Sequence, residues 1–137
     1  MTTPVDDELL EQLGRVQQAA VRLHAAVRDA NNRLTGRLGD VPLEATLAHA
    51  IRDLERRVRR LPTGDSRTHL LRWIEEQGLP AADRRTRVMI ARVVVADDGT
   101  HSLRDDSTGD DFDADYLVDV ADQLTEAART LVSGCGG

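Results

Sequence analysis

An acidic run near the C-terminus holds the side chains best suited to binding a metal ion. Within residues 105–115 (DDSTGDDFDAD), Asp111, Asp113 and Asp115 have the 1-3-5 spacing of a calcium-binding EF-hand loop. The sixth position of that loop needs Gly for its turn, and this chain has Tyr116 there. We therefore predict an exposed acidic loop without a metal, whose aspartates complement the dipole of a following helix.

Four histidines and one cysteine are the other candidates for metal binding or acid–base chemistry. The histidines are His24, His49, His69 and His101, and no two of them are three or four positions apart. Cys135 is alone, so it cannot form an internal disulfide, which favours a cytoplasmic protein. Because phosphate-binding loops, serine nucleophile elbows and HExxH motifs are also missing, we predict no enzymatic activity and no cofactor.

Arginine is the only basic residue type, with 18 Arg against 24 acidic side chains, a usage that indicates a GC-rich bacterial genome. Residues 52–92 hold 11 Arg against 6 acids, whereas residues 97–137 hold 2 Arg against 11 acids. The basic segment either binds nucleic acid, pairs with the acidic C-terminal region, or is a solvated surface. Its candidate nucleic-acid contacts are Arg56, Arg57, Arg84, Arg85 and Arg87.

The composition narrows the choice of partners. Only Trp73, Phe112 and Tyr116 are aromatic, which argues against base-stacking modules and against an aromatic ligand pocket. No apolar run approaches the roughly 18 residues of a membrane-spanning helix, and the acidic start does not resemble a signal peptide. We expect a single domain over residues 1–133 with no membrane partner.

Apolar spacing predicts an antiparallel, coiled-coil-like helical hairpin over residues 4–61. Its first helix, residues 4–34, has an unbroken 4-3-4-3-4-3-4 seam, and the second, from about residue 40 to 61, has a 4-3-4-3 seam. A short connection near Gly36–Val41 predicts antiparallel neighbours. The first seam consists of Leu9, Leu13, Val16, Ala20, Leu23, Val27, Ala30 and Leu34.

The middle of the chain, residues 66–104, is predicted to hold a short helix and a small β-hairpin. The helix covers residues 66–77 and ends at Gly78 and Pro80. Residues 81–96 are ambiguous between helix and strand, although the run Val93-Val94-Val95 favours a strand. A turn at residues 97–100 and a return strand at 101–104 complete the hairpin.

The order of helix, Gly-Leu-Pro turn, Arg-bearing stretch and hairpin over residues 66–104 resembles a winged helix-turn-helix. It departs from that motif at Arg84, where the motif packs an apolar residue. The resemblance implies the alternative function, a DNA-binding regulator that dimerises through its N-terminal helices.

The chain is predicted to finish with a helix over residues 113–132 and a flexible tail over residues 134–137. The helix seam is Leu117, Val120, Leu124, Ala127 and Leu131. The expected fold is therefore mainly α: the long hairpin packed with a C-terminal helix, with the short helix and hairpin inserted between them.

The favoured function is a non-enzymatic interaction or assembly module that forms a homodimer and holds an unidentified protein partner. A first helix of about 30 residues spans about 45 Å, which exceeds what its own chain can cover, so a second copy should cover the remainder. A third hypothesis is that the acidic C-terminal region binds a partner with a basic surface. The predicted interface residues are Leu9, Leu13, Val16, Leu23, Val27 and Leu34.

Overall fold

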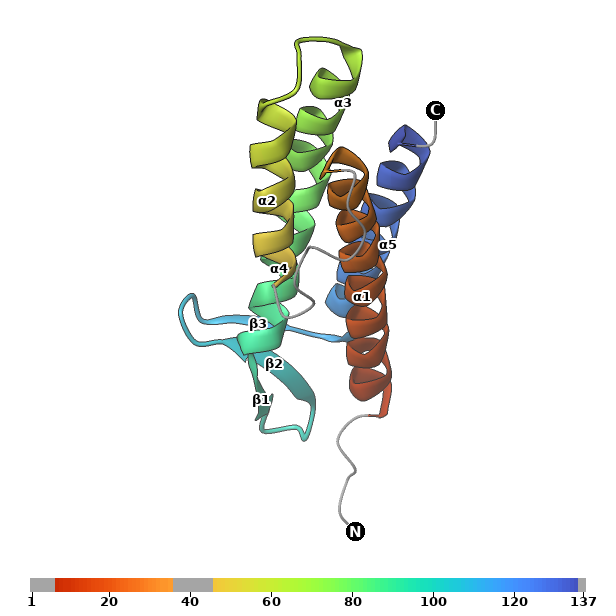
Figure 1. Cartoon of the computed structure of the whole chain (residues 1–137). Helices are drawn as coiled ribbons and strands as arrows, with labels where there is room; N and C mark the ends of the chain where they lie inside the picture. The colour runs from red at the N-terminus through yellow and green to blue at the C-terminus, as the bar shows by residue number, and fades with distance from the viewer. Residues whose placement is uncertain (1–6, 36–45, 136–137) are drawn as a thin grey trace.

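The computed structural model describes residues 7–35 and 46–135, which form a helical bundle with a small sheet at one end (Figure 1). Helix α1 (Asp7–Thr35) lies along α5 (Ala114–Cys135), and α2 (Leu47–Arg59) packs on another side of α1. The predicted mainly α fold with a small β insertion is confirmed.

The predicted seams of α1 and α5 form the centre of the core. On α1, Val16, Leu23 and Val27 are fully buried, and Ala20 and Ala30 are nearly so. These small residues let α5 approach closely, because alanine adds little bulk between two backbones. All five predicted seam residues of the last helix are also buried, namely Leu117, Val120, Leu124, Ala127 and Leu131.

The predicted antiparallel arrangement of the first two helices is wrong, because α1 and α2 run in the same direction (Figure 1). Helix α2 begins at Leu47, later than the predicted start near residue 40. The eleven residues between Thr35 and Leu47 can span at most about 36 Å, whereas the 13 residues of α2 rise only about 20 Å. Eleven residues are therefore enough to join two helices that run in the same direction. The predicted Gly36–Val41 turn lies outside the described residues.

Local hydrogen bonds fix the start of α2 and its position against α1. The Thr46 hydroxyl accepts a hydrogen bond from the His49 N–H at 3.2 Å, which caps the helix. Asn31, which is fully buried on α1, donates to the Ala50 carbonyl at 3.2 Å and accepts from Arg57 at 3.0 Å. A buried amide satisfied on both sides fixes how the two helices pack.

The predicted helix end at Gly78 and Pro80 is also wrong. Helix α3 (Asp65–Trp73) continues through a π-helical turn, η1 (Ile74–Gly78), into α4 (Leu79–Ile90). Residues 81–90, left open between helix and strand, are therefore helical. This continuous segment runs opposite to α1, α2 and α5 (Figure 1).

The π-helical turn explains why two helix-breaking residues do not end the helix. Proline lacks an N–H, and the wider turn, in which the Leu79 N–H donates to the Ile74 carbonyl, accommodates that loss. Gly78 keeps helical angles and packs against the Trp73 ring, where an added Cβ would lie 2.7 Å from a ring carbon. Gly78 is thus required by packing rather than by chain termination.

The predicted hairpin is confirmed and belongs to a three-stranded antiparallel sheet. Strands β1 (Arg92–Val95) and β2 (His101–Asp105) pair with Val95 opposite His101. Gly99 takes a φ of +85° in the connecting turn, a conformation that glycine adopts readily. A third strand, β3 (Asp110–Phe112), pairs with β2.

The acidic segment 105–115 is not a loop throughout, because it contains the end of β2, a tight turn and β3. Arg104 pairs with Asp111 across the strands at 2.7 Å, and Asp113 caps α5 by accepting from the Tyr116 N–H at 2.9 Å. The last helix extends to Cys135, so residues 134–135 of the predicted tail are helical.

Candidate functional site

The outer surface of α1 carries a second stripe of residues beside its buried seam. These residues recur at 4-3-4-3-4 spacing, so they share one side of the helix. Two of them are large apolar side chains in solvent, with Leu10 53% exposed and Val21 68% exposed. The stripe consists of Leu10, Gly14, Gln17, Val21, His24 and Arg28.

Helix α4 borders this stripe and contributes two residues to the same surface. The Gln17 Nε2 atom lies 3.9 Å from the Met89 sulfur, and Met89 is itself 41% exposed. Arg85, one turn earlier on α4, is close enough to His24 for its charge to lower the pKa of that imidazole. We call the six stripe residues together with Arg85 and Met89 the α1–α4 face.

The half of the α1–α4 face that holds His24, Arg28 and Arg85 is basic and contains unpartnered nitrogens. The Nε2 atom of His24 and the Nε atoms of Arg28 and Arg85 are buried from solvent and have no hydrogen-bond partner. Burial first, and then the charges of Arg85 and Arg28, lower the pKa of His24. A hollow of about 300 Å³ lies here, lined by Val21, His24, Ala25 and Arg28.

The predicted interface residues lie mostly inside the chain's own core. Leu9, Val16, Leu23 and Val27 are at most 1% exposed, and Leu13 and Leu34 are partly buried against the core. In this structure their partners are other parts of the same chain. The four buried residues are therefore not exposed to a second protein in this structure.

The predicted nucleic-acid contacts are spread over several surfaces. Arg56 pairs with Asp53, and Arg57 donates to Asn31. The other three face three different neighbours: α5, α1 and β2. Only two arginines of the central basic segment pair with the acidic C-terminal region in the described part of the chain, Arg87 with Asp105 and Arg92 with Asp106.

Arg84 is held inside the chain by contacts with α5. Its guanidinium carbon lies 4.7 Å from the Tyr116 ring centroid, and its Nη1 donates to the Gln123 side chain. Tyr116 in turn stacks on Phe112 with ring centroids 4.4 Å apart. The residue that departs from the winged-helix pattern is thus a packing arginine, and the turn that this motif needs at Gly78 is replaced by continuous helix.

The acidic residues that suggested calcium do not converge. Asp111 is paired with Arg104, and Asp113 caps α5. In the described ranges, no three His, Cys, Asp or Glu side chains gather closely enough to hold a metal ion. The predicted role of the aspartates at a helix start is therefore seen at Asp113.

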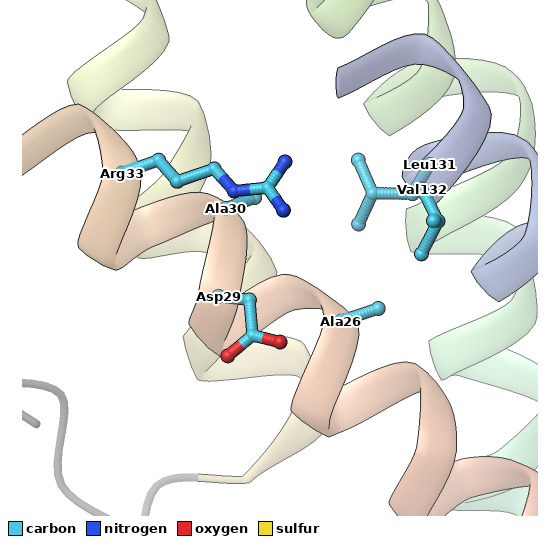
Figure 2. A pocket seen from close by; sticks show the side chains of 6 residues that line it. All are labelled: Ala26, Asp29, Ala30, Arg33, Leu131 and Val132. Carbon is cyan, nitrogen blue, oxygen red and sulfur yellow. The ribbon is translucent and has the colours of Figure 1, made fainter. Parts of the chain in front are cut away.

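A smaller hollow of about 120 Å³ lies between the C-terminal halves of α1 and α5 (Figure 2). Figure 2 shows Arg33 and Asp29 on the α1 side and Leu131 and Val132 on the α5 side. Ala26 and Ala30 complete the lining. Its charged residues both come from α1, and this hollow lacks the convergent basic groups found on the α1–α4 face.

Comparison of the chain with protein-family models, with curated proteins and with solved structures gives no match. Within the described residues, none of the helices combines the length and the apolar character needed to cross a bilayer.

Sequence reasoning found the buried seam of α1 but missed the α1–α4 face. A signal was present, because the stripe repeats with the same spacing as the seam. The residue types at Gly14, Gln17, His24 and Arg28 do not by themselves distinguish this stripe from other exposed surface. Only the approach of α4 shows that Arg85 and Met89 belong to it.

Proposed function

We propose that this protein is a non-enzymatic helical interaction module that forms a two-fold dimer through the α1–α4 face. One observation carries the proposal: three of the seven exposed large apolar side chains among the described residues belong to the α1–α4 face. Exposed apolar side chains that share a surface mark places that proteins use for association. The three are Leu10, Val21 and Met89.

The charge layout of α1 favours a second copy of this chain as the occupant. The helix begins with acidic side chains, Asp7 and Glu8, whereas the later part of the α1–α4 face carries Arg28 and Arg85. In an antiparallel pair of α1 helices related by a two-fold axis, each acidic start lies beside the basic end of the other copy. Opposite charges then meet at both ends of the contact.

Gly14 supports close contact between the paired helices. A Cβ added at Gly14 would meet nothing within 4 Å, so open space lies above the α1 backbone at this position. In the antiparallel arrangement Gln17 and Val21 lie near the two-fold axis, and Gly14 lets the partner helix approach beside them. A cytoplasmic location completes the proposal, and its support is the single cysteine in the sequence.

The test is sedimentation of the purified chain from low to high micromolar concentration. We expect a concentration-dependent shift from the chain mass to twice that mass. Val21→Asp should weaken the dimer by at least about tenfold while helix content is kept, because it places a carboxylate in the contact from both copies. Val132→Asp is the matched control, since Val132 is 57% exposed on α5.

Two outcomes contradict the proposal. A strict monomer at high micromolar concentration excludes the dimer. Equal weakening by Val21→Asp and Val132→Asp shows that the contact is not on the α1–α4 face. If the chain is monomeric but Val21→Asp abolishes capture of a different protein, the face is real and its occupant is not a second copy.

The DNA-binding alternative has weaker support from the structure. Arg57, Arg84 and Arg87 already contact other residues of the chain, so using them on DNA would require those contacts to be exchanged. Fluorescence anisotropy with duplex DNA at low salt tests this function. Binding that falls steeply with salt and is lost in Arg84→Ala with Arg85→Ala would favour it over the interaction module.

A further inference from the structure

Three basic side chains from two helices lie in one half of the α1–α4 face: His24 and Arg28 from α1, and Arg85 from α4. His24 and Arg28 are one helical turn apart on α1, and both line the 300 Å³ hollow. Arg85 approaches from α4, and its charge acts on His24 together with that of Arg28. The three therefore form one cluster although they are far apart in the sequence.

Each member of this cluster has a buried nitrogen without a hydrogen-bond partner. These atoms are Nε2 of His24, Nε of Arg28 and Nε of Arg85. Buried polar atoms in folded proteins nearly always have a hydrogen-bond partner, so these three nitrogens are exceptions. His24 and Arg28 also line the hollow, and Arg85 is close enough for its charge to act on His24.

Other arginines of the described chain have polar or acidic partners, unlike Arg28 and Arg85. Arg84 on α4 has Gln123 and Tyr116 as neighbours, and Arg87 lies 4.0 Å from Asp105. Arg28 and Arg85 have no carboxylate within ion-pair distance among the described residues. Two guanidinium groups and an imidazole thus stand together without a counter-charge.

We propose that the His24–Arg28–Arg85 cluster binds an oxyanion of the phosphate or carboxylate class. Guanidinium groups bind such anions through paired N–H donors, and the imidazole supplies a further N–H. A hollow of about 300 Å³ has room for a phosphate ion. The bound anion would give the buried nitrogens their acceptor and reduce the repulsion within the cluster.

Two sources can supply this chemistry: a free phosphate ion, or a carboxylate from the acidic start of α1 in a second copy. The site itself does not depend on the proposed dimer, because its donors all come from one chain. Only the second source requires that dimer. The two sources predict different effects of phosphate on the dimer, dissociation in one case and no change in the other, and the experiment uses this difference.

Binding should strengthen as the pH falls. In the free protein, burial, Arg85 and Arg28 lower the pKa of His24, so the imidazole is neutral near neutral pH. A bound anion stabilises the protonated imidazole and raises that pKa. Arg28 from α1 and Arg85 from α4 are the charged groups of the described chain that act on His24.

The experiment titrates the full chain with inorganic phosphate at constant ionic strength, with sodium chloride as the non-specific control. We expect saturable one-to-one binding by calorimetry, with shifts in the His24 imidazole resonances. The pH dependence is measured with sulfate, which stays a dianion over this range, and its binding should be tighter at about pH 6 than at about pH 8. Arg28→Gln and Arg85→Gln should each weaken binding by about tenfold or more. Arg72→Gln, an exposed arginine on α3, is the matched control.

The result is decisive because removing an unpaired arginine should leave the fold intact, which circular dichroism checks. Absence of saturable binding at millimolar phosphate, or equal weakening by Arg72→Gln, overturns the proposal. Sedimentation in the same phosphate series identifies the source of the anion. Phosphate that dissociates a dimer indicates that a carboxylate of the second copy occupies the site, whereas an unchanged dimer indicates a free ion. A monomeric chain that still binds phosphate contradicts the dimer alone.

Discussion

The two flanks of α1 differ in how completely the chain covers them. Toward α5, the helix presents Val16, Leu23 and Val27, which are fully buried against the seam of the partner helix. Toward α4, it presents Val21 in solvent and His24 with an unpartnered buried nitrogen. The flank toward α5 is covered by the chain, whereas the flank toward α4 has exposed apolar surface and nitrogens without a hydrogen-bond partner.

The comparison shows what periodicity can and cannot reveal. Both flanks repeat with alternating steps of three and four residues, so spacing alone does not distinguish them. The difference lies in side-chain type: leucine, valine and alanine can close against α5, whereas Gly14, Gln17 and Arg28 cannot form a dry contact within the chain. A repeated polar stripe beside a core seam is therefore worth examining as a binding surface.

The sharpest test of this contrast uses two residues that are two positions apart on α1. Leu23→Ala should lower the free energy of unfolding by about 2–5 kcal/mol, because Leu23 is fully buried and its loss leaves a cavity. Val21→Ala should change it by less than about 0.5 kcal/mol, because Val21 is 68% exposed. Urea denaturation at low protein concentration measures both, and equal losses would remove the distinction between the flanks.

A second test makes the same substitution at two helical glycines and expects opposite signs. Gly78→Ala should destabilise the protein by about 1–3 kcal/mol, because the new Cβ would lie 2.7 Å from the Trp73 ring. Gly14→Ala should stabilise it by about 0.5–1 kcal/mol, since nothing lies within 4 Å and alanine favours helix. Thermal unfolding of the two variants checks the signs; a stabilised Gly78→Ala would show that Trp73 can move aside.

Acid should lower the free energy of unfolding by protonating Asp105 on β2, which lies near Arg87 of α4. Hydrogen bonds from Ser107, with Arg87 nearby, hold the pKa of the nearly fully buried Asp105 below its usual value. Since the folded pKa is the lower one, this stabilisation is present above the unfolded pKa of about 3.9 and is lost as the pH falls through the folded value.

We therefore expect the native chain to lose more unfolding free energy between about pH 7 and about pH 3 than the Asp105→Asn variant. Asparagine keeps an acceptor oxygen for Ser107 but has no charge to titrate. Asp122→Asn, at an exposed position on α5, is the control and should retain the native acid dependence. If Asp105→Asn showed the same acid dependence as the native chain, Asp105 would not be a cause of that dependence.

The smallest effect is expected at Arg85. Arg85→Gln should leave the free energy of unfolding within about 0.5 kcal/mol of the native value or raise it slightly, because the Nε of this guanidinium has no partner and its charge repels its basic neighbours. The pKa of His24 should rise, since one cause of its lowering is removed. A proton NMR titration of His24 measures this shift, and an unchanged pKa would place Arg85 too far away to share its site.

Much of the fold could be predicted because apolar spacing records which residues share a helix face. This information identified the seams of α1 and α5 and the hairpin between β1 and β2. It could not give helix direction, since that depends on the length of the segment before Leu47. It also misread Gly78, because helix termination and contact with the Trp73 ring both require glycine.

The candidate site was less predictable than the fold. His24 and Arg28 could be placed on one helix face from their spacing, but Arg85 joins them only through tertiary packing. Arg84 and Arg85 are adjacent in the sequence, yet one stacks on Tyr116 and the other acts on His24. Charge counts over a segment therefore cannot show which arginines have a partner and which do not.

The π-helical turn before α4 sets which of its arginines meets which neighbour. By carrying one residue more than an α-helical turn, residues 74–78 rotate everything after them by about 100° about the helix axis. Arg84 then faces α5, Arg85 faces α1 and Arg87 faces β2. Deleting one residue from that turn would turn Arg84, Arg85 and Arg87 toward different neighbours at once. A change of one residue in the length of this helix would therefore redistribute the charges of the molecule.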